Sequence, residues 1–561
     1  MASRISLALC LFFSNSCYKQ KMSDIIIVAP IFTMNDNQPW AEAVAIKNNS
    51  ILYVGSKKRV FEYKDNTTHI IRNPNGLVLP GFIDNHVHLI ESGIEFSGCQ
   101  LAGLKNKKEI IQEINEYVNK YPDKEWIRGS GFDLTIFKNG NPKKELLDKI
   151  IGNRPAYFLS SDAHTAWVNS KALELAGITK YSKDPPNGTI ERDPKTKEPS
   201  GALREDAKKL VSEILPLYSK KELDIALHKA SKEANKFGIT TIFDAGSESI
   251  RTTESSYGPI DSYRNATKNN KISLRVESSF VVYPDTWKQD IIKLKKNRFK
   301  NNFGSLNTIK IYADGVIEGG TASLFEPYKG TNNYGLLNWH IDTLKQVIAI
   351  FEKEGANIHV HAIGDRAISD VLDAFEYAKN KNKFYNNRHV ISHVQLVHPK
   401  DLIRFNRLGI IASFQALWAY PDNYIKELTL PVLDSTRASW MYPLQSISSN
   451  GGVIVGGSDW SVTSLDPLEA IEVAITRKEP GSESGETLNS HESVSLTTIL
   501  KAYTIDAAYA LLKEDIVGSI EVGKVADIIM LNKNIFKSPN HEIHKAKVDI
   551  TIFDGKIVYT R

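Results

Sequence analysis

Two histidines in the segment GFIDNHVH have the spacing of a metal-binding pair. His86 and His88 are two residues apart, after an apolar run that begins at Leu77. In an extended strand both side chains would project from one face, because side-chain direction alternates along a strand. Neutral imidazole is a common ligand of zinc and related ions, and a catalytic site leaves one position open for water. The alternative is a pair of histidines that cap a strand and form hydrogen bonds there.

Further polar residues occur at or near the ends of other strand-like segments. They are Lys310, His361, His393 and Asp459. Core histidines placed without a function would not be expected to recur so regularly. The pattern therefore favours one metal site assembled from several strands. His359 is in phase with His361 on the same segment, and periodicity alone does not choose between them.

The elements that must position these residues alternate between strand and helix patterns, which is typical of parallel βα units. Eight such strands predict an α/β fold, a (β/α)8 TIM-like barrel with its active site at the carboxyl ends of the strands. The predicted strands cover residues 79–84, 238–244, 273–281, 308–315, 356–362, 388–394, 409–415 and 453–459.

Short strands and tight turns flank this body on both sides. Residues 23–78 and 513–561 have this texture, including an Asp554-Gly555 turn. We expect the two segments to form one composite β-sandwich around a barrel domain at 79–512. The interval 95–235 is too long for a βα connection and predicts an inserted subdomain at the barrel mouth, able to contribute substrate contacts.

Composition excludes several classes of protein. The net charge is +5 over 561 residues, and the basic residues are scattered, so we expect no nucleic-acid partner. There are three cysteines, Cys10, Cys17 and Cys99, too few for a disulfide framework or a cysteine-rich zinc module. A metal must therefore be held by His, Asp, Glu or Lys. For a chain of this length we expect a homodimer.

The first 22 residues resemble an export signal, with Arg4 followed by the apolar run ISLALCLFF. Cys17 follows this run as the lipid-attachment cysteine does in bacterial lipoproteins, although Ser14 stands where an apolar residue is usual. This predicts a periplasmic protein or one anchored to an envelope membrane by a lipid on Cys17. The alternative is a cytoplasmic protein whose translation starts at Met22.

Beyond these patterns, the chain resembles the amidohydrolase superfamily, and specifically amidohydrolase family 3, which includes formamide-deformylase-like enzymes. The motifs that carry the resemblance are LPGFIDNHVHL, SSDAHTAWVNSKALELAGI, IKIYADGVIEGGTASLFEPY, HVHAIGDRAI, ISHVQLVHPKD, VGGSDWSV with DPLEAI, and GSIEVGKVADIIML. They occur in the family's order after residue 24. Ser392 departs from the family, which usually has glutamate before the histidine of the sixth strand.

The resemblance implies a ligand set. His86 and His88 would bind a first divalent metal, which we expect to be zinc, and His361 and His393 would bind a second, so that one or two ions are expected per chain. Asp459 would ligate the first metal and act as the general base and acid of hydrolysis. Lys310 would be carboxylated and bridge both ions; the alternative is a lysine paired with Asp314 in a one-metal site. The motif around Asp162, His164 and Asn169 would contact substrate, or else stabilise a turn.

These expectations lead to one predicted function and two alternatives. The chain would be a metal-dependent hydrolase of a non-peptide carbon-nitrogen bond in a small molecule, an N-substituted amide or formamide. Within the same metal chemistry, the alternative is a cyclic amidase, a deaminase or an esterase. From another class, the alternative is a non-catalytic, envelope-tethered binding protein that keeps the barrel as a scaffold.

Overall fold

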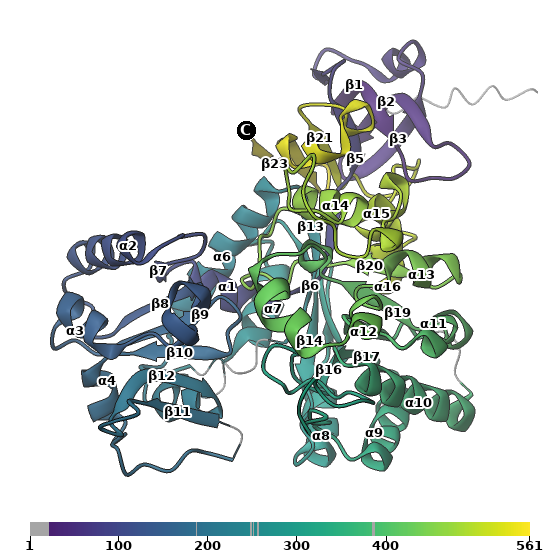
Figure 1. The fold of residues 1–561 in the computed structure, drawn as a ribbon. Helices are drawn as coiled ribbons and strands as arrows, with labels where there is room; N and C mark the ends of the chain where they lie inside the picture. Colours follow the sequence, from purple (N-terminus) through teal and green to yellow (C-terminus); the bar gives the residue numbers. More distant parts are fainter. Residues whose placement is uncertain (1–21, 187, 247–249, 251, 255–256, 384–386) are drawn as a thin grey trace, which may run out of the picture.

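An eight-stranded parallel barrel forms the centre of the molecule (Figure 1). The computed structural model describes residues 22–561 except 187, 247–249, 251, 255–256 and 384–386. Neighbouring barrel strands pair in parallel, which confirms the predicted α/β barrel. In spatial order the strands are β6 (Phe82–Val87), β13 (Ile239–Asp244), β14 (Arg275–Val281), β16 (Gly304–Tyr312), β17 (Asn357–Ala362), β18 (Val390–His393), β19 (Ile411–Phe414) and β20 (Ile454–Gly456).

The barrel closes between β20 and β6, at the position of two candidate site residues. The backbone N–H of Asp459 donates to the carbonyl oxygen of His86 at 2.7 Å. Gly457 makes this approach possible, because a Cβ there would lie 2.7 Å from the backbone nitrogen of His86. Closure of the barrel and assembly of the site therefore depend on the same contact.

The apolar run before His86 differs from its predicted form. Residues 79–84 were expected as one barrel strand, but the run divides at Gly81. Its first part, β5 (Leu77–Pro80), pairs with β21 (Ile528–Leu531) outside the barrel, and only β6 enters the barrel. At the break, a Cβ on residue 81 would lie 2.3 Å from the Thr240 side chain. The shift puts His86 inside β6 and His88 just beyond it, as the N-cap of α1 (Leu89–Glu95).

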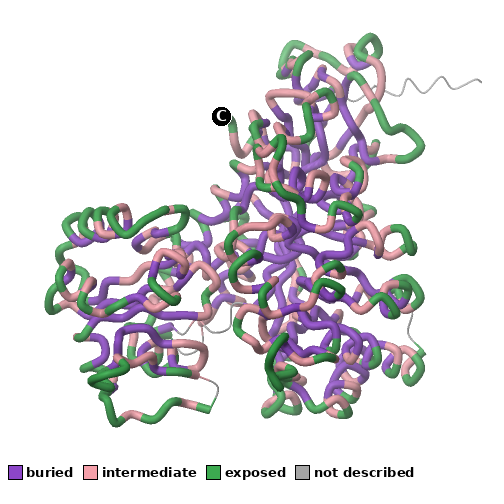
Figure 2. Tube along the Cα trace, in the orientation of Figure 1, coloured by how far each residue is buried: buried purple, intermediate pink, exposed green. Residues whose placement is uncertain are grey.

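Helices cover the outside of the barrel (Figure 1), and buried residues follow the barrel strands and parts of the surrounding helices (Figure 2). In α6 (Lys220–Lys236), Leu223, Leu227, Ala230 and Ala234 are buried, which is the spacing of one helix face. The other covering helices include α7 (Pro259–Lys268), α8 (Trp287–Asn297), α9 (Ile341–Lys353), α10 (Asp365–Asn382), α11 (Leu402–Leu408), α13 (Leu444–Ser449), α14 (Pro467–Thr476), α15 (Leu496–Ala502) and α16 (Ile505–Ala510).

The two ends of the described chain meet in one mixed sheet, beside the barrel (Figure 1). β5 joins the strands from the first end to β21, the first strand of the C-terminal segment. The composite terminal domain is therefore formed from both predicted segments. Besides β5 and β21 its strands are β1 (Ile25–Phe32), β2 (Trp40–Lys47), β3 (Ser50–Gly55), β4 (His69–Arg72), β22 (Val548–Phe553) and β23 (Lys556–Thr560).

The insertion forms a lobe beside the barrel, with a six-stranded sheet and buried clusters of its own (Figures 1 and 2). It ends before α6, whereas the predicted insertion continued to residue 235. The apolar face of α6 suits either domain, and its packing against α1, α7 and the barrel strand β13 assigns it to the barrel. The lobe contains β7 (Cys99–Gln100), β8 (Ile127–Phe132), β9 (Ala156–Ser160), β10 (Thr165–Val168), β11 (Gly188–Arg192), β12 (Pro199–Glu205), α2 (Lys107–Lys120), α3 (Lys144–Ile151), α4 (Ser170–Leu175) and α5 (Lys209–Ser212).

The predicted export segment lies outside the described residues except for Met22, and Cys10 and Cys17 lie outside them as well. Cys99 is buried and forms no disulfide. Among the described helices, none combines the length and apolar composition needed to cross a membrane.

Candidate metal centre

His86, His88 and Asp459 bring their polar atoms together at the carboxyl ends of β6 and β20. Asp459 Oδ1 lies 3.5 Å from His86 Nε2 and 3.3 Å from His88 Nε2. One ligand atom from each of the three residues fits within 4.8 Å of the others. On the far side of its ring, His88 Nδ1 donates to the carbonyl oxygen of Gly246 at 3.0 Å. This bond leaves His88 Nε2 directed at Asp459.

Asp459 is a buried carboxylate that a bound cation would stabilise. It is 6% exposed, and its Oδ1 has no well-aligned hydrogen-bond donor among the described residues. Burial raises the pKa of Asp459, but the neighbouring His88, His393 and Lys310 outweigh burial and lower it to about 2. A buried anion bounded by imidazole nitrogens is a donor set that suits a divalent metal ion. The residues present therefore fit the metal that the family resemblance implies.

Lys310 lies on β16 at the level of the first pair of histidines. It is fully buried, and its Nζ is 3.4 Å from His86 Nε2. Burial lowers the pKa of Lys310 to about 7, against the opposing charges of Asp459 and Asp244. The expected alternative partner, Asp314, instead accepts the backbone N–H groups of the segments after β16 and β17. Lys310 therefore points into the candidate centre without that partner.

His361 and His393 form a second pair of imidazoles, with ring centroids 4.5 Å apart. The His393 ring also lies 4.8 Å from the His86 ring, and its Nδ1 is 4.0 Å from Asp459 Oδ2. Burial is the main cause that lowers the pKa of His393, to about 4, so this imidazole is neutral. His361 Nε2 lies 3.2 Å from the carbonyl oxygen of Gly315, which can accept a hydrogen bond from it. The six predicted ligand residues are thus neighbours, and among the described residues the compact group of ligand atoms is that of His86, His88 and Asp459.

His359 lies deeper in the barrel than His361. In the β16–β17 pairing, His359 is opposite Lys310, whereas His361 is opposite Tyr312, two residues nearer the mouth. The Nε2 atom of His359 is 3.0 Å from His86 Nδ1, the nitrogen that faces away from Asp459. Burial lowers the pKa of His359 well below its ordinary value. Of these two rings, His361 is therefore the one beside His393.

The sequence did not predict three residues that contact the centre, namely Gln415, Trp418 and Gly246. Gln415 Oε1 lies 2.7 Å from His393 Nδ1, and Trp418 stacks on the His393 ring at 5.4 Å with parallel planes. Gln415 ends a predicted strand, so the strand-end rule could have found it. Trp418 and Gly246 have no comparable signal, because their positions depend on loops.

The substrate residues predicted in the insertion make their hydrogen bonds with other residues of the insertion. The Asn169 side chain caps α4, accepts a hydrogen bond from the backbone N–H of Ala156 and donates one to the carbonyl oxygen of Arg154. Its polar atoms therefore stabilise the local structure. Asp162 accepts the backbone N–H of His164. His164 Nδ1 lies 2.9 Å from Glu205 Oε1, and both side chains are 36% exposed. His164 is thus the one of the three that offers an accessible ring.

Glu205 connects this part of the insertion with the barrel mouth. A Cβ on Gly319, in the loop after β16, would lie 3.7 Å from Glu205 Oε1. Burial lowers the pKa of His164, but the hydrogen bond and charge of Glu205 outweigh it and raise the pKa above its ordinary value. His164 and Glu205 therefore form an ion pair at the border between the insertion and a loop at the carboxyl end of the barrel.

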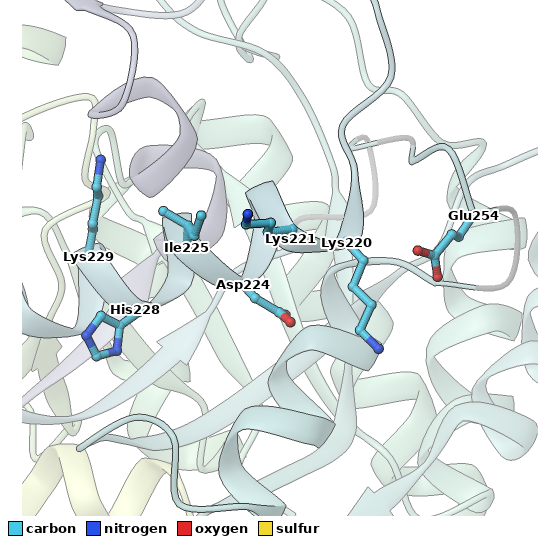
Figure 3. Close-up of a pocket in the computed structure, with 7 residues that line it drawn as sticks. All are labelled: Lys220, Lys221, Asp224, Ile225, His228, Lys229 and Glu254. Atoms are coloured by element: carbon cyan, nitrogen blue, oxygen red, sulfur yellow. The ribbon is translucent and has the colours of Figure 1, made fainter.

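An open groove on the outer side of α6 is separate from the centre (Figure 3). None of the predicted site residues lines it. Three of its seven lining residues are lysines, and within the part of the chain that the structure describes the compact group of possible metal ligands is that of His86, His88 and Asp459. The lining residues are Lys220, Lys221, Asp224, Ile225, His228, Lys229 and Glu254.

Comparison with protein families gives a match over most of the chain. The model of the amidohydrolase family matches residues 74–559. Protein LONG AFTER FAR-RED 3 of Arabidopsis thaliana is 32% identical over 546 residues, which cover 96% of this chain and 92% of that protein. N-substituted formamide deformylase of Arthrobacter pascens is 24% identical and covers 96% of this chain and 99% of its own length.

Solved structures share the fold. An uncharacterized metal-dependent hydrolase from Pyrococcus horikoshii superposes with a TM-score of 0.72 at 21% identity, over 92% of this chain and 99% of that one. A second uncharacterized metal-dependent hydrolase, from Pyrococcus furiosus, gives a TM-score of 0.69 at 24% identity, over 91% and 99% of the two chains.

Proposed function

The chain belongs to the amidohydrolase family, and we propose that it is a metal-dependent hydrolase of a non-peptide carbon–nitrogen bond in an N-substituted amide or formamide. The observation that carries the proposal is the convergence of four imidazoles, a buried lysine and Asp459 at the carboxyl ends of barrel strands. The full-length similarity to a formamide deformylase supports the choice of bond.

The proposed ligands are His86 and His88 for one ion, with Asp459, and His361 and His393 for a second. A divalent ion in such a site polarises a carbonyl group and makes water more acidic. Lys310 would bridge the two positions as a carbamate, because a buried ammonium would repel the ions. The ammonium first loses a proton, and the neutral amine then forms the new nitrogen–carbon bond to CO2 and releases a second proton, so the cation would be replaced by an anion.

Asp459 would be the catalytic residue for proton transfer. Its carboxylate accepts a proton from water as the oxygen attacks the amide carbon, and then delivers that proton to the leaving nitrogen as the carbon–nitrogen bond breaks. The products are a carboxylic acid, or formate, and an amine. The His88–Gly246 hydrogen bond holds the His88 ring beside Asp459 and limits the motion of both groups.

The test combines metal analysis with a substrate panel. The full-length protein is expressed with bicarbonate and zinc, and its metal content is measured. N-substituted formamides, N-acyl amines, cyclic amides and aminopurines are then offered, and release of formate, amine and ammonia is measured. We expect amine release with one or two metal ions per chain. Ammonia from aminopurines without amine release would replace the proposal with a deaminase, and a protein without metal or turnover would favour a binding protein.

A further inference from the structure

We propose that His359 is a positioning residue that holds His86 in the tautomer required for metal binding. The inference deepens the proposed function, because it rests on His86 being a metal ligand. Periodicity alone allows either His359 or His361 to be the metal ligand of this strand. The position of the His359 ring indicates a different role. The argument depends on which nitrogen of each ring faces which neighbour.

The two nitrogens of His86 face opposite sides of the ring. Nε2 is directed at the candidate centre, 3.4 Å from Lys310 Nζ and 3.5 Å from Asp459 Oδ1. Nδ1 is directed into the barrel, 3.0 Å from His359 Nε2. To bind a metal through Nε2, a neutral His86 must carry its proton on Nδ1. In that state Nδ1–H donates to His359 Nε2.

His88 has a comparable arrangement with a different partner. Its Nδ1 donates to the carbonyl oxygen of Gly246, and its Nε2 faces Asp459. A carbonyl oxygen can only accept, so the tautomer of His88 is determined by its backbone partner. His359 can either donate or accept. The tautomer of His86 therefore depends on which nitrogen of His359 carries the proton.

The surroundings of His359 hold its ring in this geometry. The ring is 2% exposed and stacks on Phe243 with centroids 4.5 Å apart and planes inclined by 16°. Its backbone lies between β16 and β18, paired with Lys310 and Val390. Rotation of the ring would break the stacking and leave buried nitrogen atoms without partners, which is costly. The ring is thus placed to orient His86 before any ion binds.

Reversing the shared proton would prevent metal binding through His86. If His359 Nε2–H donated to His86 Nδ1, a neutral His86 would carry its proton on Nε2, where the lone pair is needed. The arrangement therefore requires His359 to be protonated on Nδ1 and to accept through Nε2. Hydrogen-bond partners of ligand imidazoles commonly contribute to metal affinity in this way.

The experiment measures zinc affinity by chelator competition in the full-length protein and in two variants. His359→Phe keeps a ring but removes the acceptor, and we expect it to weaken zinc binding by about 10- to 100-fold. His359→Gln supplies a carbonyl oxygen in place of Nε2 and should retain most of the affinity. The number of ions bound at saturation should remain that of the unaltered protein in both variants.

A matched control is His389, a buried imidazole that stacks on Phe375 at 5.0 Å and lies 3.1 Å from Glu352 Oε1. His389→Phe and His389→Gln make the same chemical changes in the barrel without touching His86. We expect equal zinc affinity for these two variants. A loss of affinity in His389→Phe as large as in His359→Phe would assign the effect to packing and overturn the proposal.

Cobalt substitution gives a second readout, and its first measurement uses the unaltered protein. In the Co²⁺-loaded unaltered protein, the His86 Nδ1–H proton should give a paramagnetically shifted, slowly exchanging proton signal. The signal should persist in His359→Gln and be lost in His359→Phe. Its absence from the unaltered protein would refute the hydrogen bond. Loss of one bound ion in both His359 variants would instead identify His359 as a ligand.

These measurements need no substrate. Failure to hydrolyse amides would contradict the proposed function and leave the comparison of zinc affinities intact. Equal affinity in the unaltered protein and both His359 variants would contradict the positioning role and leave the proposed function intact.

Discussion

Asp459 combines a buried carboxylate with an unusual backbone. Its φ angle is 54°, in the left-handed region that aspartate and asparagine tolerate better than most residues. His393, at the end of another barrel strand, also has a positive φ of 75°. Such conformations cost free energy and are concentrated at functional sites. Asp459 and His393 thus both have an unusual backbone conformation near the carboxyl end of a barrel strand, where their side chains enter the candidate centre.

Replacing Asp459 with asparagine tests its role in proton transfer. Asparagine has nearly the same shape and accepts the same φ, so Asp459→Asn should fold normally. Turnover should fall by about 10²- to 10⁴-fold or more, because the amide cannot accept the proton from water. Steady-state kinetics and the thermal midpoint measure the two effects. Asp466→Asn, a buried helix cap at α14, is the control and should keep full turnover. Retained activity in Asp459→Asn would contradict the assignment.

The metal content of a Lys310 variant tests whether this residue bridges two ions as a carbamate. Lys310→Ala should lose metal, and a short carboxylate such as acetate should restore part of it by occupying the space of the carbamate. Elemental analysis after dialysis, with and without acetate, measures both. The control is Lys513→Ala, which removes another lysine, paired with Glu277 at 2.6 Å, and should leave metal content unchanged. If Lys310→Ala binds as much metal as the unaltered protein, the carbamate is excluded.

At the scale of elements, the insertion and the barrel contribute differently. Each proposed metal ligand comes from a barrel strand or the residues directly after it, whereas His164 and Glu205 come from β10's leading turn and the end of β12. Sites on strands hold their geometry closely, and loops around them vary substrate contacts. We therefore propose that the barrel carries the chemistry and that the border with the insertion contributes to substrate recognition.

His164→Gln should change substrate binding without changing the metal. If the ring donates to substrate, its loss should raise KM by about tenfold, the effect of one hydrogen bond that involves a charged group. Metal content and kcat should stay near those of the unaltered protein. Asp184→Asn, which alters an exposed ion pair with Arg192 elsewhere in the insertion, is the control. An unchanged KM would leave His164 as a residue of the local turn.

At the scale of the whole molecule, a buried ion pair joins the barrel to the terminal sheet. Arg275 on β14 donates to Asp527, just before β21, at 2.9 Å, and its guanidinium also lies 3.4 Å from Asp554. Arg275 and Asp527 are 5% and 4% exposed. A buried charge without its partner is unfavourable, so the pair holds the two domains in one relative position.

Breaking this pair should destabilise the protein through the charge left behind. Arg275→Met should lower the free energy of unfolding by about 3–5 kcal/mol, since Asp527 would be buried without its main partner. The double variant Arg275→Met with Asp527→Asn should recover part of the loss. Urea unfolding followed by fluorescence and circular dichroism measures both variants. Equal stability of the single variant and the unaltered protein would show that the pair makes no net contribution.

Much of the architecture could be predicted because it depends on local periodicity. Alternating strand and helix patterns identified the eight parallel strands, and strand-like segments at both ends predicted one composite β-sandwich, whose two parts share one sheet in the structure. Boundaries were less accurate. The division of the apolar run at Gly81 and the membership of α6 depend on what each segment packs against, and apolar spacing is the same in either domain.

Residue types and spacing also determined which side chains could meet, since carboxyl ends of parallel strands share one edge of the barrel. Tertiary structure decided the rest. His359 and His361 are equivalent in phase, and the family motif alone selected His361. The structure gives the physical difference, because His359 is opposite Lys310 and His361 lies two residues nearer the mouth. The partners Gly246, Gln415 and Trp418 follow from loops and long-range packing, which periodicity along the chain does not encode.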